Sequence, residues 1–218
     1  MKGRVIWVFR EPRSGSSWFT SRLANTLDRQ YYFFDDMLSK KMIDFNQRLE
    51  YFLHRKQEPD DVNKLLNTHH FFGLQSMSNY TDPILIRVTR KNKVEHFCSI
   101  WISRNIVGKF YNVHNEYELS KYPEIKPVEI PYKHVYQYID KIKINEQLWN
   151  TYATGYENET VTYEQLLDNF SSTLLPIENW SMQVPQEGLS IKLPYNKKEV
   201  IINYSFIENI IRENLDYK

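Results

Sequence analysis

The chain has 218 residues, of which 41% are hydrophobic and 15% aromatic, so it is long enough to bury a sizeable core. Its 28 Lys and Arg residues against 27 Asp and Glu residues give a formal net charge of +1, which argues against attraction of nucleic acid or anionic lipid by an overall field. A single cysteine excludes an internal disulfide, and no apolar leader precedes the first strand pattern, so we expect a cytoplasmic protein without membrane insertion. No linker-like stretch divides the sequence, which predicts one domain over residues 1–218.

The first predicted element is a buried strand over residues 5–9, with the sequence VIWVF. A continuously apolar run is typical of a parallel strand that is covered on both faces. It is followed by REPRSGSSW at residues 10–18, after which Phe19 and Leu23 recur at helical spacing. This order of strand, loop and helix start leaves the N–H groups of residues 15–17 available to an anion. We therefore predict a phosphate-binding loop.

Strand and helix patterns alternate along the rest of the chain. This alternation predicts an α/β fold, a three-layer sandwich with a mainly parallel central sheet, whose ligand lies beyond the carboxyl ends of the strands. Strands are predicted at 30–34, 64–69, 83–89 and 160–163, helices at 37–55, from Val94 and at 134–152, and a surface loop at 111–132. The polar groups that follow predicted strands are Arg13, Asp35, Asp36, His69, His70 and Arg90.

The glycine loop differs from that of nucleotide triphosphatases. It holds one glycine, Gly15, and lacks the lysine followed by Ser or Thr that positions phosphates and Mg²⁺. The histidines are scattered apart from one doublet, so no metal-ligand cluster is predicted. We expect a loop that binds phosphate without a metal.

Residues 13–18, RSGSSW, resemble the 5′-phosphosulfate loop of the sulfotransferases that use 3′-phosphoadenosine 5′-phosphosulfate (PAPS). Arg90 at a strand end, with Ser99 nine residues later in a helix, is similar to the 3′-phosphate element of that family. The segment TYEQL at 162–166 looks like the family's Tyr-Glu-x-Leu segment, whose tyrosine lies near the adenine.

The three elements occur in the family's order and imply a P-loop NTPase-like fold. They also imply transfer of a sulfuryl group from PAPS to a hydroxyl or amine of a small-molecule or glycan acceptor, with 3′-phosphoadenosine 5′-phosphate (PAP) as the product. Arg13 would then stabilise charge on the leaving phosphate. The cofactor-binding residues implied by the resemblance are Arg13, Ser14, Gly15, Ser16, Ser17, Trp18, Arg90, Ser99 and Tyr163.

A base must take the acceptor's proton. His69 is our first choice, because NTHH at 67–70 looks like the Lys-Thr-His segment of cytosolic relatives, although Asn67 replaces the lysine. Asp35 or Asp36 is the alternative, since other branches of the family place a carboxylate after the second strand. His70 is the third candidate.

Two other functions compete with this hypothesis. One is an ATP-using, kinase-like transferase on the same fold, which would require Mg²⁺ and ignore a 3′-phosphate. The other is a catalytically silent nucleotide-binding module. The sequence favours no particular acceptor or oligomeric state.

Overall fold

The computed structural model describes residues 5–15, 19–20, 23, 31–35, 63–68, 71–79, 82–107, 124–169 and 195–215. Contacts between residues group the chain into two compact units, each made of two stretches of sequence. The first comprises Met1–Arg90 and Asn145–Val184, and the second comprises Lys91–Ile144 and Pro185–Lys218. The expectation of one domain stays a prediction.

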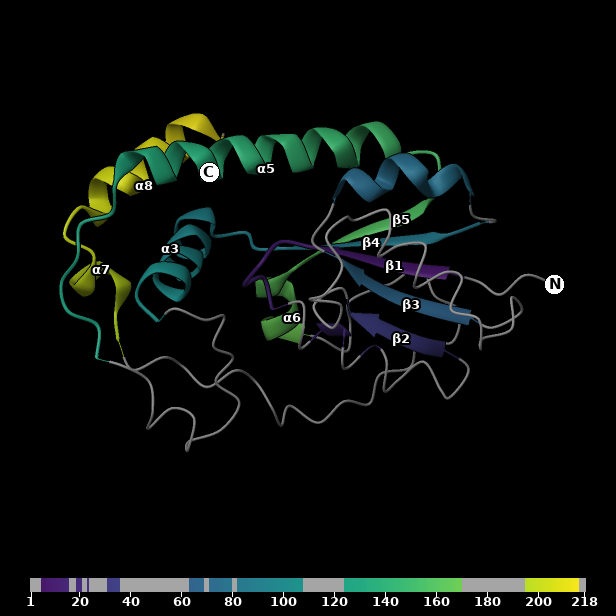
Figure 1. The fold of residues 1–218 in the computed structure, drawn as a ribbon, viewed down its shortest axis with the longest axis horizontal. Helices are drawn as coiled ribbons and strands as arrows, with labels where there is room; N and C mark the ends of the chain where they lie inside the picture. Colours follow the sequence, from purple (N-terminus) through teal and green to yellow (C-terminus); the bar gives the residue numbers. More distant parts are fainter. Residues whose placement is uncertain are drawn as a thin grey trace. The chain divides into compact units, whose positions relative to one another are not determined.

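The first unit holds a five-stranded sheet in which every pair of neighbouring strands is parallel. The strand order is β2-β3-β1-β4-β5, which Figure 1 shows as neighbouring arrows. The bounds are β1 Val5–Arg10, β2 Tyr31–Asp35, β3 Asn63–Thr68, β4 Ile84–Thr89 and β5 Glu157–Thr162. The predicted α/β class with a parallel sheet is therefore confirmed.

Both faces of β1 are buried, as its apolar sequence predicts. On one face, Trp7 and Phe9 belong to a cluster with Phe71 of the 3₁₀ helix η2 (Phe71–Asn79) and with Trp149. On the other face, Ile6 and Val8 cluster with Phe19, Leu23 and Leu166, the last from α6 (Tyr163–Asn169). Helical segments thus cover the central strand on both sides.

The strand bounds differ from the predictions at two informative places. β4 begins at Ile84 rather than Pro83, because proline has no N–H for the ladder. β5 ends at Thr162 because Thr162 and Gln165 form a capping box that starts α6: Gln165 N–H donates to Thr162 Oγ1 (3.2 Å) and Thr162 N–H donates to Gln165 Oε1 (2.8 Å). Tyr163 is therefore the first helical residue rather than the last strand residue.

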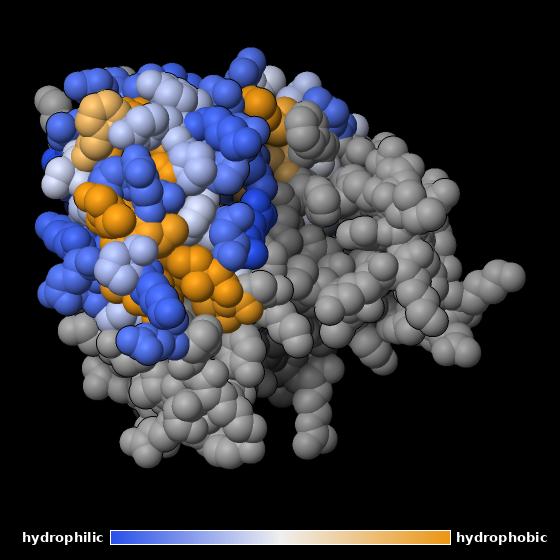
Figure 2. Space-filling model, turned by 60° about the vertical axis from the view of Figure 1, so that its left-hand side comes forward, coloured by the Kyte–Doolittle hydropathy of each residue, from blue (hydrophilic) through white to orange (hydrophobic). Residues whose placement is uncertain are grey.

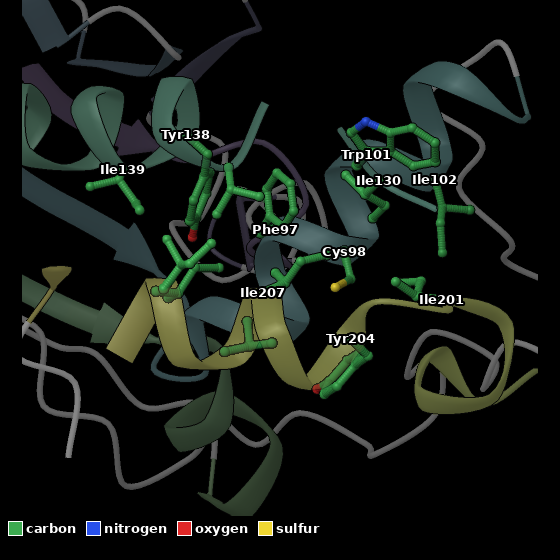
Figure 3. Packing of buried hydrophobic residues seen from close by; sticks show 14 of the residues in the cluster. Phe97, Cys98, Trp101, Ile102, Ile130, Tyr138, Ile139, Ile201, Tyr204 and Ile207 are labelled. Atoms are coloured by element: carbon green, nitrogen blue, oxygen red, sulfur yellow. The ribbon is translucent and has the colours of Figure 1, made fainter. Parts of the chain in front are cut away.

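The second unit is built from helices. Asn92 caps α3 (Lys93–Asn105), its Oδ1 accepting a hydrogen bond from Glu95 N–H at 3.0 Å. Figure 3 shows Phe97 of α3, Tyr138 of α5 and Ile207 of α8 in its core. The remaining elements are α5 (Tyr132–Tyr152), whose residues up to Ile144 belong to this unit, α7 (Lys197–Val200) and α8 (Tyr204–Asn214).

Apolar side chains also reach the surface of the second unit. On the face drawn in Figure 2, orange apolar residues interrupt a mainly hydrophilic surface. Among the exposed apolar side chains of this unit, the rings of Tyr132 and Phe206 lie tilted to one another with centroids 4.9 Å apart, and Ile202 is 69% exposed. None of the described helices has the length and apolar character needed to cross a membrane.

Candidate functional site

The loop after β1 is a tight turn over Glu11–Ser14. Ser14 donates to the Glu11 carbonyl oxygen twice, from its N–H (3.2 Å) and from its hydroxyl (2.6 Å). Pro12 occupies the second position, and Arg13, at the third, has a φ of 63°. This is the pattern of a type II turn, whose third position normally takes glycine or asparagine. Arg13 is therefore held in a strained conformation of the kind that gathers at functional sites.

The side chain of Glu11 anchors this turn to β4. Its carboxylate is buried and accepts hydrogen bonds from Arg87 Nη2 (3.3 Å) and Thr89 Oγ1 (2.8 Å). Its N–H donates to the Val88 carbonyl (3.3 Å), which extends the pairing of β1 with β4. Arg87 Nη1 also lies 3.8 Å from Glu146 Oε1. Charges buried at this depth need such partners, so the network fixes where the loop begins.

Gly15 is required at its position for two reasons. Its φ is +76°, which strains any side chain, and a Cβ there would lie 2.4 Å from Cδ2 of Tyr163. Phe19 N–H donates to the Gly15 carbonyl at 3.0 Å, which is the spacing of four residues found in an α-helix. The Tyr163 ring therefore lies directly against the loop backbone.

Arg90 lies on the same ring. Its Cζ is 4.9 Å from the centroid of Tyr163, and its Nε is 3.8 Å from Oε1 of Glu164. Arg90 directly follows β4, whereas Tyr163 directly follows β5. One aromatic ring thus brings together the glycine loop and a guanidinium group that are far apart in sequence.

No protein-family model matches the chain, and no curated protein sequence matches it either. The function must therefore be inferred from the residues at the carboxyl ends of β1, β4 and β5. This arrangement can hold an anion: the loop after β1 carries Arg13 and Gly15, Arg90 follows β4, and the Tyr163 ring after β5 contacts both Gly15 and Arg90.

The other predicted site residues are described less fully. Asp35 ends β2, and its backbone pairs with Asn67 of β3. Ser99 is buried in α3 of the second unit, whereas Arg90 belongs to the first, so their pairing stays a prediction. Ser16, Ser17, Trp18, Asp36, His69 and His70 lie outside the described residues. Across the ranges that are described, no three His, Cys, Asp or Glu residues are grouped so that they could hold a metal ion.

A second charged cluster lies within the helical unit. Glu95 of α3 accepts hydrogen bonds from Lys197 Nζ and from the Tyr204 hydroxyl, the latter at 3.0 Å. Burial, and then the Glu95 carboxylate, raise the pKa of the Tyr204 hydroxyl above its ordinary value. Lys197 is thus committed to an ion pair with Glu95.

Sequence reasoning missed Glu11, Arg87 and Glu164. A signal for Arg87 was present, because a charged residue inside the apolar strand ILIRVT must have a buried partner. Glu11 could not be matched to it from the sequence, because their contact depends on the register of β1 with β4, which pairs Arg10 with Val88.

Proposed function

We propose that this protein is a sulfotransferase that moves a sulfuryl group from PAPS to a hydroxyl or amine of a small-molecule or glycan acceptor. The observation that carries the proposal is the Tyr163 ring, which contacts Gly15 on the loop and lies 4.9 Å from the Arg90 guanidinium. A nucleotide with phosphates at both its 5′ and 3′ positions needs two anion sites separated by little more than a sugar. The loop and Arg90 fit that requirement.

The topology supports a P-loop NTPase-like version of the α/β fold. With the order β2-β3-β1-β4-β5, the chain leaves β1 toward one edge of the sheet and leaves β4 toward the other. Ligands of open α/β sheets bind at the carboxyl ends of two neighbouring strands whose following connections lead to opposite edges of the sheet. The loop with Arg13 follows β1 and Arg90 follows β4, so both proposed phosphate contacts border that point.

The residues present also fit the proposed reaction. The acceptor oxygen or nitrogen forms a bond to sulfur while the bond between sulfur and the 5′-phosphate oxygen breaks, and PAP leaves with the electron pair. Arg13 stabilises the charge that builds on that phosphate, and a base takes the acceptor's proton. We propose His69 as this base, with Asp35, Asp36 and His70 as the alternatives. The loop has no P-loop lysine with an adjoining Ser or Thr, so the proposed transfer uses no Mg²⁺.

Binding of PAP tests the proposal most simply. Isothermal titration calorimetry without Mg²⁺ should give a Kd well below millimolar, because two phosphate groups meet two arginines. A titration with Mg²⁺ and ATP serves as the comparison. Tight, Mg²⁺-dependent ATP binding together with no PAP binding below about 1 mM would favour the kinase-like alternative.

Transfer itself needs a second assay. Wild-type protein with radiolabelled PAPS should label at least one member of a panel of phenols, sugars and amines. His69→Ala should reduce that rate by about 100-fold or more if His69 is the base, and Asp35→Ala should do so if the carboxylate is. PAP binding without any transfer to the panel would instead favour a silent nucleotide-binding module.

A further inference from the structure

Arg90 has a charged neighbour that the proposed reaction does not use. Glu164 Oε1 lies 3.8 Å from Arg90 Nε, and the side chains are only 31% and 18% exposed. This separation is too long for a hydrogen bond. Arg90 Nε is buried and donates no hydrogen bond to any described residue. The contact is therefore an ion pair that supplies charge without a directed hydrogen bond.

The orientation of Arg90 has a different source. Its guanidinium lies over the Tyr163 ring, which holds a cation by its face. Tyr163 is itself fixed between the Gly15 backbone and the start of α6, where the Thr162 and Gln165 capping box sets the first turn. Removing the charge of Glu164 should therefore leave the position of Arg90 largely unchanged.

We propose that Glu164 weakens the hold of Arg90 on the 3′-phosphate and so sets the affinity for PAPS and the release of PAP. The inference rests on the proposed function. A carboxylate beside the guanidinium cancels much of its field and repels a phosphate dianion that approaches the same group. A nucleotide that lacks the 3′-phosphate has no charge at this point and does not experience the repulsion. Glu164 is thus a specificity-determining residue that acts through Arg90.

Glu164 could instead be explained by its place in the first turn of α6, where a helix favours a carboxylate. The two explanations predict different behaviour. A stabilising role in the helix affects the unfolding temperature and leaves the preference between nucleotides unchanged. A role in setting affinity changes that preference even when the unfolding temperature stays the same.

The test compares PAP with adenosine 5′-phosphate by calorimetry on the full chain. Glu164→Gln keeps the side-chain size and removes the charge, so PAP affinity should rise by about three- to tenfold, while affinity for adenosine 5′-phosphate stays constant. The gain should shrink in high salt, and Glu164→Asp, which keeps the charge, should behave as wild type. Glu157→Gln, an exposed carboxylate on β5, is the matched control and should change neither affinity.

The outcomes separate this inference from the proposed function. If the wild type binds PAP and Glu164→Gln binds it equally well or less tightly, the inference is wrong and the proposed function stands. If the wild type binds no PAP, both are wrong. Glu164→Ala, with its unfolding temperature measured alongside, provides a second variant that should shift the preference in the same direction.

Discussion

Arg13 combines an unfavourable backbone conformation with a side chain that we propose contacts the leaving phosphate. A positive φ costs a non-glycine residue on the order of 1 kcal/mol, and here it is imposed by the turn that Ser14 and Glu11 close. Glycine would satisfy the turn more easily but would supply no charge. In the proposed function, the Arg13 guanidinium on the leaving phosphate is what offsets this strain.

Replacement of Arg13 by glycine should separate these two effects. Arg13→Gly relieves the strained φ at some cost in unfolded-chain entropy, so the free energy of unfolding should stay within about 1 kcal/mol of wild type. PAP affinity should nevertheless fall by tenfold or more, because a charge-assisted contact is lost. Urea denaturation and calorimetry measure the two quantities.

Asp82 offers the matched control, since it is the other described non-glycine residue with a positive φ, at 46°. Asp82→Gly should leave PAP binding unchanged with a comparably small effect on stability. Equal losses of PAP affinity in the two variants would show that the loss is not specific to the Arg13 charge.

Gly15 and Tyr163 should be energetically coupled. Gly15→Ala forces a Cβ into the Tyr163 ring and should lower the free energy of unfolding by about 1 to 3 kcal/mol. In a Tyr163→Ala background the steric part disappears and only the backbone strain remains, so the same change should cost about 1 kcal/mol less. A double-mutant cycle by urea denaturation checks this, and strict additivity would contradict the packing described above.

At the scale of elements, β4 anchors the loop after β1 through Arg87. Arg87 points from this strand to the Glu11 carboxylate at the end of β1, and both side chains are buried. Truncating one member of such a pair leaves the other charge buried without its partner, which typically costs about 3 to 5 kcal/mol. The position of the loop after β1 therefore depends on Arg87, a residue of another strand.

Arg87→Ala should therefore destabilise the protein by about 3 kcal/mol or more in urea denaturation. The double variant Glu11→Ala with Arg87→Ala should lose less than the sum of the single changes, because no isolated charge remains. Arg104→Ala removes an exposed arginine of α3 and serves as the control, with an expected change within about 0.5 kcal/mol. Equal effects of Arg87→Ala and Arg104→Ala would contradict the anchoring role.

Elements with a strong local pattern could be predicted from the sequence, whereas others could not. The apolar runs of β1 and β4 and the spacing of Val94, Phe97 and Trp101 fixed their elements to within a few residues. η2 was missed because a 3₁₀ helix has a different period and here contains Gly73. α8 was overlooked although Ile207, Ile210 and Ile211 show helical spacing.

The same distinction applies to the site. Arg13, Gly15, Arg90 and Tyr163 stand in local motifs, so the sequence was enough to propose them, and the structure brings Gly15, Arg90 and Tyr163 together. Arg90 follows the end of β4, and Glu164 lies just beyond the end of β5. The two side chains meet only because β4 and β5 pair in parallel. Charge partners across a sheet depend on register, which a single sequence does not specify.

At the scale of the whole molecule, Tyr204 of the helical unit should make the free energy of unfolding fall at alkaline pH. Because the folded state raises the pKa of Tyr204, it favours the protonated hydroxyl. This contribution is fully present below the ordinary tyrosine pKa of about 10 and is lost as pH rises above it. Between about pH 8 and about pH 11, wild type should lose about 1 kcal/mol more unfolding free energy than Tyr204→Phe.

Urea denaturation at the two pH values measures this difference. Tyr136→Phe, a change at a half-exposed tyrosine of the same unit, provides the control and should lose as much as wild type. A Tyr204→Phe protein with the wild-type dependence on pH would show that this hydroxyl is not held in its protonated form by folding.

The most direct measurement for the proposed function is the ratio of the Kd for adenosine 5′-phosphate to the Kd for PAP, determined by calorimetry for wild type and for Arg90→Ala. The two nucleotides differ only in the 3′-phosphate, and a charge-assisted contact to it is worth about 10- to 100-fold in affinity. Wild type should show a ratio of that size, and Arg90→Ala should bring it close to one while binding of adenosine 5′-phosphate persists. A wild-type ratio near one, or a large ratio that survives Arg90→Ala, would contradict a nucleotide held between the glycine loop and Arg90.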